Sequence, residues 1–413
     1  MKFSILTLGC KVNQYESNMM KEKMLSSNFI YTENFKESSI IIVNTCSVTD
    51  VSDKKCLKLI RRLKRENENS ILVVVGCSSF NNQDLYKSLD IDILLGNKDK
   101  SKIDILIKNY IKNKKEIVRF YNTRDLEFED MSISKFDHVR AFIKIEDGCD
   151  NFCSYCIIPY VRGSVRSKNM EKVINEAKVL CENGHKEIVL TGIHTGQYND
   201  DGYDLTDLIN ELSKIDTLKR IRISSIEITE LNDKFLNMLY KNDKVCDHLH
   251  IPLQAGSNKI LKKMNRKYDL SYFEEKINKI RSIRPDISIT TDIIVGFPDE
   301  TDVDFEDTLN FSKKINFSKI HVFPYSKRIG TPAASMPNQV SEQVKKNRVK
   351  KLIELSNSLE DAYYKKFIGK NLSVLIEDVK NNVSIGHTSN YLKVSINKKL
   401  NKNEIYDILY GGK

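Results

Sequence analysis

Three cysteines in one short loop have the spacing of iron–sulfur ligands. Cys149, Cys153 and Cys156 form a C-x3-C-x2-C motif. Three thiolates can bind three irons of a four-iron cluster and leave the fourth iron open, whereas clusters that only transfer electrons take four thiolates. A fourth ligand from elsewhere in the chain, or a zinc ion in place of the cluster, is compatible with the spacing alone. The motif therefore predicts a metal centre, and an open iron would make that centre reactive.

The position of this loop in the chain favours a catalytic cluster. Residues 141–145 alternate as a strand does, so the three cysteines would follow the carboxyl end of a strand. Active sites of (β/α) barrels lie at that end of their strands. We therefore expect a small molecule, S-adenosylmethionine, to bind the open iron.

A second set of cysteines is spread along the first part of the chain. Cys10, Cys46 and Cys77 each follow a predicted strand. Parallel strands bring their carboxyl ends to one edge of a sheet, so these thiols would meet there and could hold a second cluster. Chance placement at strand ends is the alternative. Cys56 and Cys181 lie on apolar helical stripes and are expected in the core. The sequence suggests no role for Cys246.

The composition indicates a cytoplasmic protein with more than one domain. A chain of 413 residues, of which 40% are hydrophobic, can bury two or three cores. Nine cysteines fit reduced thiols and metal ligation better than a disulfide framework. No apolar stretch approaches the roughly 20 residues that a bilayer requires, and the N-terminus lacks a signal-peptide pattern, so we expect no membrane segment. Lys plus Arg exceed Asp plus Glu by 66 to 56, and this net charge of +10 favours an anionic partner without identifying it.

The order of predicted strands and helices divides the chain into three parts. Residues 1–122 alternate strands and helices, which predicts an α/β domain with a parallel sheet. A polar, irregular segment at residues 121–136 is the expected linker. Residues 135–366 contain six predicted strands with helices between them, which indicates a partial (β/α)6 barrel that is open on one side. Residues 367–413 show strand-like alternation and predict a small β-barrel.

Polar and small residues at the ends of the predicted barrel strands are candidates for binding S-adenosylmethionine. They are Thr191, Gly192, Ser225, Glu227, Gln254, Asp292 and Gly296. Glycine lets a ligand approach the backbone closely, and the polar groups can hold the amine, ribose and adenine of the cofactor. A turn position or a buried hydrogen bond is the alternative role for each residue.

A helix predicted at residues 53–65 has a dense basic face. Its cations are Lys54, Lys55, Lys58, Arg61, Arg62, Lys64 and Arg65, of which Lys55, Lys58, Arg61 and Arg62 are the expected RNA contacts. Such a surface can follow phosphates, although a solvated helix face has the same composition. Arg328, at the end of the sixth barrel strand, could contact either cofactor or RNA.

Several motifs together resemble the methylthiotransferases, radical S-adenosylmethionine enzymes that put a methylthio group on tRNA bases or on a ribosomal protein. The motifs are TLGCKVNQ at residues 7–14, NTC at 44–46, GC at 76–77, the three-cysteine loop, LTGIHTG at 190–196 and HLHIPLQ at 248–254. GCKVN, TGIHTG and HVFPYSKR at residues 321–328 are similar to the branch that acts on threonylcarbamoyladenosine beside the tRNA anticodon. Asp299 and the pair Ser78-Ser79 depart from the family pattern, but none of them is a candidate cluster ligand.

The resemblance implies radical chemistry with two [4Fe-4S] clusters. The C-x3-C-x2-C loop would hold the cluster that binds S-adenosylmethionine, and cysteines 10, 46 and 77 would hold an auxiliary cluster that carries sulfur. One cofactor molecule would generate the radical that attacks the adenine C2–H, and a second would supply the methyl group. The implied partners are the anticodon loop of tRNA and a low-potential electron donor such as flavodoxin or ferredoxin. The C-terminal part would be a TRAM-like, RNA-binding β-barrel.

Other functions fit parts of this pattern. The same chemistry could act on isopentenyladenosine in tRNA or on an aspartate of a ribosomal protein. An iron–sulfur protein that binds RNA or transfers electrons without radical catalysis is the alternative of a different class. Such a protein should not cleave S-adenosylmethionine when reduced.

Overall fold

A parallel sheet forms the first part of the chain. The computed structural model describes residues 1–412, and its first six strands have the order β2-β1-β3-β4-β5-β6, with every neighbouring pair parallel. The strands are β1 (Lys2–Thr7), β2 (Ile30–Tyr31), β3 (Ile40–Thr45), β4 (Ile71–Gly76), β5 (Ile93–Leu95) and β6 (Ile117–Arg119). The helices are α1 (Lys11–Ser26), α2 (Asp50–Glu66), α3 (Cys77–Asn81), α4 (Gln83–Lys87) and α5 (Ile103–Asn113). Every residue of β3 and β4 is buried, because both faces of a parallel sheet are covered by helices.

The segment between the sheet and the barrel is irregular but well packed. It contains a single turn of 3-10 helix at Thr123–Asp125, and three of its apolar side chains, Met131, Ile133 and Phe136, are buried. The Tyr15 hydroxyl of α1 donates a hydrogen bond to the carbonyl of Met131 at 3.0 Å. The expected linker is therefore a fixed strap along α1.

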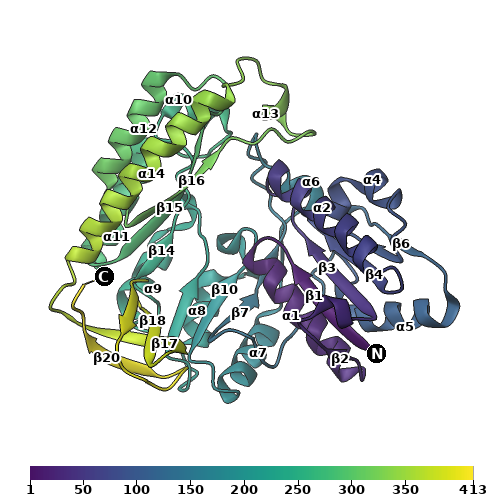
Figure 1. Ribbon diagram of the computed structural model, residues 1–413. Coiled ribbons are helices and arrows are strands. Elements are labelled where there is room, and N and C mark those ends of the chain that lie inside the picture. The colour runs from purple at the N-terminus through teal and green to yellow at the C-terminus, as the bar shows by residue number, and fades with distance from the viewer. Residues whose placement is uncertain (413) are drawn as a thin grey trace.

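Six parallel strands form the central part. They are β7 (Arg140–Lys144), β10 (Glu187–Thr191), β13 (Arg220–Ile223), β14 (His248–His250), β15 (Ser288–Val295) and β16 (Lys319–Pro324). One ladder has the order β13-β10-β7 and the other the order β14-β15-β16, and a parallel bridge between Ile221 and Val245 joins them. Figure 1 shows the strands as an arc with the N-terminal sheet beyond β7. The predicted partial barrel is confirmed.

Most helices of the central part cover the outside of the arc, and pairs of two-residue strands follow some of its strands. The helices are α6 (Ile158–Arg162), α7 (Met170–Glu182), α8 (Leu205–Leu212), α9 (Asp233–Lys241), α10 (Asn258–Lys263), α11 (Leu270–Ile283), α12 (Asp302–Ile315), α13 (Pro332–Ser335) and α14 (Glu342–Lys365). Strand β8 (Glu146–Asp147) pairs with β9 (Arg166–Ser167) across the three-cysteine loop and α6, and β11 (Asn199–Asp200) pairs with β12 (Tyr203–Asp204) in a hairpin. Among the described helices, none combines the length and the apolar character that a membrane crossing requires.

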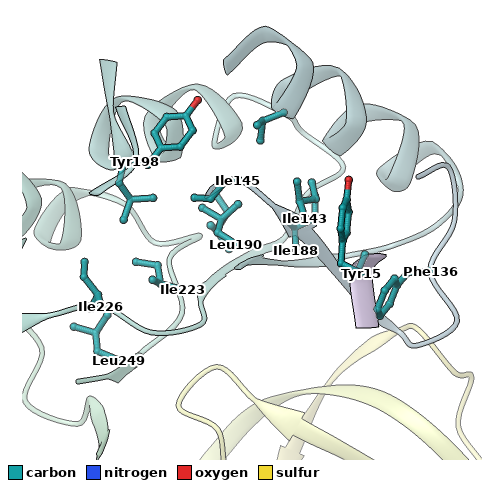
Figure 2. Close-up of a cluster of buried hydrophobic side chains, with 14 of the residues drawn as sticks. Tyr15, Phe136, Ile143, Ile145, Ile188, Leu190, Tyr198, Ile223, Ile226 and Leu249 are labelled. Atoms are coloured by element: carbon teal, nitrogen blue, oxygen red, sulfur yellow. The ribbon is translucent and has the colours of Figure 1, made fainter. Parts of the chain in front are cut away.

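One apolar core joins the N-terminal sheet to the barrel. Tyr15 of α1 and Phe136 of the strap lie beside Ile143 of β7 and Ile188 of β10 (Figure 2), and all four side chains are buried in the same cluster. Burial of large apolar side chains contributes about 1.5–3 kcal/mol for each of them. The shared core therefore fixes α1, and the cysteine that precedes it, relative to the barrel.

The C-terminal part is a four-stranded antiparallel sheet in the order β19-β18-β17-β20. Its strands are β17 (Asn371–Lys380), β18 (Val383–Thr388), β19 (Lys393–Ile396) and β20 (Ile405–Leu409). The predicted C-terminal strands are present, and within residues 1–412 no ladder joins β19 to β20. Arg220, at the start of β13, donates hydrogen bonds to the carbonyls of His387 and Ser373 at 3.0 and 2.6 Å. The sheet thus covers the amino ends of the barrel strands, opposite the three-cysteine loop (Figure 1).

Candidate active site between two sets of cysteines

The three-cysteine loop lies where the sequence predicts it, at the carboxyl end of β7. Gly148 precedes it with φ +89°, and a Cβ there would stand 2.0 Å from the Ser164 carbonyl oxygen, so only glycine fits this turn. Arg266 donates a hydrogen bond to the Cys153 sulfur at 3.3 Å, and the His194 Nδ1 lies 3.7 Å from the Cys149 sulfur. Two polar side chains therefore contact thiols that the sequence assigns to a cluster.

The strand-end cysteines gather at one edge of the N-terminal sheet. Strands β1 and β4 both pair with β3, so the residues that follow the three strands are neighbours. A Cβ on Gly9, which precedes Cys10, would lie 2.8 Å from the Cys46 sulfur. Cys46 is also within electrostatic reach of both Cys10 and Cys77. Cys10 is exposed at this edge and the other two are buried.

Burial favours the protonated form of four cysteines in the two sets. It raises the pKa of Cys46 and of Cys156 to about 12, and it also raises the pKa of Cys77 and Cys149. Iron ligation requires the thiolate, so cluster binding would release protons here. No three Cys, His, Asp or Glu side chains of residues 1–412 converge on the position of a single metal ion. Two sets of three thiols suit iron–sulfur clusters, whose irons each take their own ligand.

A buried arginine connects the two sets of cysteines. Arg162, on the helix that follows the three-cysteine loop, donates a hydrogen bond to the Cys77 sulfur at 3.1 Å. Its Nη1 lies 3.0 Å from Asp147 and 3.2 Å from Glu16 of α1. Lys100 and Lys144 complete this network, which is almost completely buried. The helix that follows the three-cysteine loop is thus fixed to the Cys77 thiol and to α1 by buried polar contacts.

Two of the candidate cofactor residues lie beside the three-cysteine loop. Gln254 and Asp292 line a cavity of about 190 Å³ together with Cys156. Gln254 has φ +69°, a left-handed conformation that costs energy in a non-glycine residue. Glu227 forms an ion pair with Arg266, the residue that contacts the Cys153 sulfur.

The other candidate cofactor residues are buried or contact neighbouring groups of the protein. A Cβ on Gly192 would lie 2.6 Å from the Glu146 carboxylate, and one on Gly296 would lie 2.3 Å from Lys345 of α14. Thr191 is buried at the end of β10, and the Ser225 carbonyl accepts a hydrogen bond from the Thr195 hydroxyl. In this structure the two glycines therefore make room for neighbouring side chains.

Comparison with known proteins decides the family. The model of the radical SAM superfamily matches residues 143–312, and the model described as uncharacterized protein family UPF0004 matches residues 2–96. The threonylcarbamoyladenosine tRNA methylthiotransferase MtaB of Bacillus subtilis is 40% identical over 94% of this chain and 88% of its own length. The protein of the same name from Thermotoga maritima is 40% identical over 94% of this chain and 90% of its own. The chain belongs to the methylthiotransferase family. It is therefore a radical S-adenosylmethionine enzyme that transfers a methylthio group and uses a [4Fe-4S] cluster.

Other relatives of this methylthiotransferase widen the comparison. A tRNA-2-methylthio-N(6)-dimethylallyladenosine synthase from Acetivibrio thermocellus is 36% identical over 91% of this chain and 81% of its own length. The radical S-adenosylmethionine methyltransferase TsrM from Kitasatospora setae has a TM-score of 0.60 at 13% identity, over 81% of this chain and 77% of its own. At that identity the likeness shows a shared fold alone.

The sequence did not reveal three polar residues of this methylthiotransferase that contact the cysteine loops: Glu146, Arg162 and Arg266. The buried Glu146 carboxylate accepts a hydrogen bond from the His194 amide at 2.6 Å, and burial raises its pKa to about 8. Glu146 and Arg162 flank the C-x3-C-x2-C motif closely, so their positions were an available signal. Arg266 is brought in from a distant loop, and no local pattern marks it.

The expected RNA contacts are at two different places. Helix α2 starts with Thr49, whose hydroxyl accepts a hydrogen bond from the Ser52 amide, and it buries Cys56, Ile60 and Leu63. The opposite face exposes all four of the predicted helical contacts, Lys55, Lys58, Arg61 and Arg62, and Arg62 pairs with Glu66 at 2.9 Å.

Arg328, which the sequence predicts to contact either cofactor or RNA, lies inside the protein. It is buried, and its guanidinium contacts Asp53 at 2.5 Å and the Ser47 hydroxyl at 2.7 Å. The ion pair connects the end of the barrel to the start of α2, a segment that is distant in the sequence. In this structure Arg328 fastens the N-terminal sheet over the open side of the barrel.

Proposed function

We propose that this methylthiotransferase replaces the C2 hydrogen of N6-threonylcarbamoyladenosine, 3′ of the tRNA anticodon, with a methylthio group. The observation that carries the proposal is the 40% identity to two proteins named for this reaction, over 94% of the chain. The aromatic C2–H is neither acidic nor open to simple nucleophilic attack, so the substitution calls for the radical chemistry that reduced cluster and S-adenosylmethionine supply. A tRNA substrate would place the enzyme in the cytoplasm.

The chain provides one set of thiols for each of two [4Fe-4S] clusters. Cys149, Cys153 and Cys156 would leave one iron open for S-adenosylmethionine, and cysteines 10, 46 and 77 would hold the auxiliary cluster. Hydrogen bonds to cluster sulfurs adjust reduction potentials, and Arg266 and Arg162 are placed to donate them, at Cys153 and Cys77 respectively.

The cavity beside Cys156 is the place that we propose for the cofactor. Gln254 and Asp292 offer an amide and a carboxylate to its polar groups. Glu227 would act through Arg266, which it holds against the Cys153 thiol. Thr191, Gly192, Ser225 and Gly296 would shape the adjoining strand ends rather than supply side-chain contacts.

The exposed cations of α2 would hold the RNA. Lys55, Lys58 and Arg61 form no ion pair within the described part of the chain, so they can bind phosphates. An unpaired base of an anticodon loop can reach an active site without the melting of a duplex. A low-potential donor such as flavodoxin or ferredoxin would deliver the electrons.

Nucleoside analysis tests the proposal directly. Mass spectrometry of tRNA from cells with and without this gene should show loss and recovery of 2-methylthio-N6-threonylcarbamoyladenosine. Loss of the methylthio derivative of isopentenyladenosine instead would contradict the substrate, and no change in any methylthio nucleoside would contradict a tRNA substrate. With purified protein, Cys149→Ala should abolish cleavage of S-adenosylmethionine, whereas Cys10→Ala should retain cleavage and lose methylthio insertion. Equal loss of cleavage in both variants would refute separate roles for the two clusters.

A further inference from the structure

A cavity with both polar and apolar lining lies between the barrel strands and the C-terminal sheet. It has a volume of about 580 Å³, within the range of small-ligand sites, and it extends from the inner faces of β7, β13, β14 and β15 to Lys11 of α1. His250, which lines it, lies 3.3 Å from Asp292, a residue of the proposed cofactor cavity. Lys11 directly follows Cys10. The cavity is therefore linked to the proposed cofactor cavity by the His250–Asp292 contact and to the proposed auxiliary cluster by the Cys10–Lys11 peptide.

Most cations around this cavity are already paired. Arg140 lies 3.0 Å from Glu377, Arg222 lies 2.6 Å from Glu187, and Lys319 lies 2.8 Å from Glu360. Lys11 differs, because none of the described residues provides a carboxylate for it, and its charged neighbours are the cations Arg140 and Arg222. A half-buried cation next to two others is unfavourable unless an anion joins them.

A tyrosine of the C-terminal sheet indicates that the cavity is electropositive. Tyr391, between β18 and β19, stacks on His248 with a centroid distance of 4.7 Å, and Arg222 lies 4.8 Å from its ring. Burial alone raises the pKa of Tyr391, but Arg140, Lys11 and Arg222 outweigh it, and the net shift is downward. Anions are therefore favoured here despite the nearby carboxylates.

We infer that this cavity, through Lys11, binds the carboxylate of the threonylcarbamoyl group on the substrate adenosine. The inference rests on the proposed function and adds to it the residue that would select the substrate. N6 and C2 flank N1 of the same adenine ring, so a group on N6 must lie near the site where C2 reacts. Cys10 is next to Lys11, which places a carboxylate receptor beside the proposed sulfur-carrying cluster. The apolar isopentenyl group would leave Lys11 without a counter-ion.

The same cations could instead contact an RNA phosphate, and binding measurements separate these two anions. The probes are two anticodon stem-loops of identical sequence, one with N6-threonylcarbamoyladenosine and one with plain adenosine. Fluorescence anisotropy under anaerobic conditions would give the Kd of each for the cluster-loaded wild type and for three variants. Lys11→Met removes the charge, Lys11→Arg retains it, and Lys23→Gln removes an exposed charge at the other end of α1 as the matched control.

We expect the wild type to bind the modified stem-loop about tenfold to a hundredfold more tightly, the range for a hydrogen bond to a charged group. Lys11→Met should remove most of this preference while binding of the unmodified stem-loop stays the same, and Lys11→Arg and Lys23→Gln should keep it. Iron and sulfide contents equal to those of the wild type would show that the cluster beside Lys11 is intact.

Two results would overturn the inference. Equal weakening of both stem-loops by Lys11→Met would assign the lysine to a phosphate, and an unchanged preference would remove Lys11 from recognition. Product analysis with the wild type distinguishes a failure of the cavity assignment from a failure of the proposed function. If the wild type methylthiolates the modified stem-loop while Lys11→Met keeps the preference, only the cavity assignment fails. If the wild type forms no product from it, the proposed function fails and the cavity assignment with it.

Discussion

Two groups of buried charge lie on either side of α1, and they differ in how their cations are paired. Between the N-terminal sheet and the barrel, Arg162, Lys144 and Lys100 each contact the Glu16 carboxylate, and Asp147 binds two of them. Inside the barrel, Lys11 is close to two arginines and has no carboxylate among the described residues. Removing one partner of a buried ion pair is costly, so the first group stabilises the joint between the two parts. The second group keeps its capacity for an external anion.

The largest effect is expected from the paired group. Glu16→Gln would leave three buried cations with a single carboxylate, Asp147, and should lower the free energy of unfolding by about 3–5 kcal/mol. Urea unfolding of the full chain, followed by circular dichroism, measures this change. Glu37→Gln is the control, because Glu37 pairs with Lys2 at the surface and exposed pairs contribute about 0–1 kcal/mol. Equal losses in both variants would contradict the distinction between buried and exposed pairs.

The pH dependence of stability should come from the same carboxylate. Burial alone raises the pKa of Glu16, but Lys100, Lys144 and Arg162 outweigh it and hold the pKa well below its usual range. A carboxyl with a lowered pKa in the folded state stabilises above its unfolded pKa of about 4.3, and this contribution is lost as the pH falls towards the folded value. The free energy of unfolding of the wild type should therefore approach that of Glu16→Gln as the pH falls below about 4.3. If the difference in free energy of unfolding between the two proteins stayed constant below about pH 4.3, Glu16 would be excluded as the source of the pH dependence.

A smaller effect is expected from the exposed cations of α2, a third group. Replacing Lys55, Lys58 and Arg61 together with glutamine should weaken tRNA binding and reduce the slope of log K against log salt by about 2, at about 0.7–0.9 per lost phosphate contact. The chemical identity of the modified nucleoside in the product should not change. The control replaces Lys346, Lys350 and Lys351, which are exposed on α14, and removes the same amount of charge. Equal slopes for the two triple variants would mean that α2 acts only through net charge.

The smallest effect is expected for the stability of the Lys11→Met variant. Loss of an unpaired, half-buried cation should leave the free energy of unfolding unchanged or raise it by about 1 kcal/mol or less. The same urea titration measures it beside Glu16→Gln. A loss as large as that of Glu16→Gln would show that Lys11 has a structural partner and would abolish the contrast between the two groups.

Local sequence patterns predicted the strands and helices well, but they did not predict every side-chain contact between distant segments. The segments that form β3 and β4 each begin with at least four consecutive branched aliphatic residues, so their strands follow from the sequence. The buried side of α2 follows from the spacing of Cys56, Ile60 and Leu63. The ion pair of Arg328 with Asp53 was not predicted because the two residues lie far apart in the chain, and Arg266 is likewise far in sequence from the cysteine that it contacts. The C-terminal strands were recognised, but whether their sheet closes depends on edge pairing that alternation does not encode.

The sequence by itself determined the chemistry: two sets of three thiols, six barrel strands with polar ends, and a basic helix. These follow from residue type and spacing, which act over a few positions. Tertiary structure alone decided that Arg162 and Glu16 join the two thiol sets and that Lys11 faces a cavity without a carboxylate partner. Such outcomes depend on which side chains from distant segments share a low-dielectric interior, where pairing or its absence sets the energy of a charge.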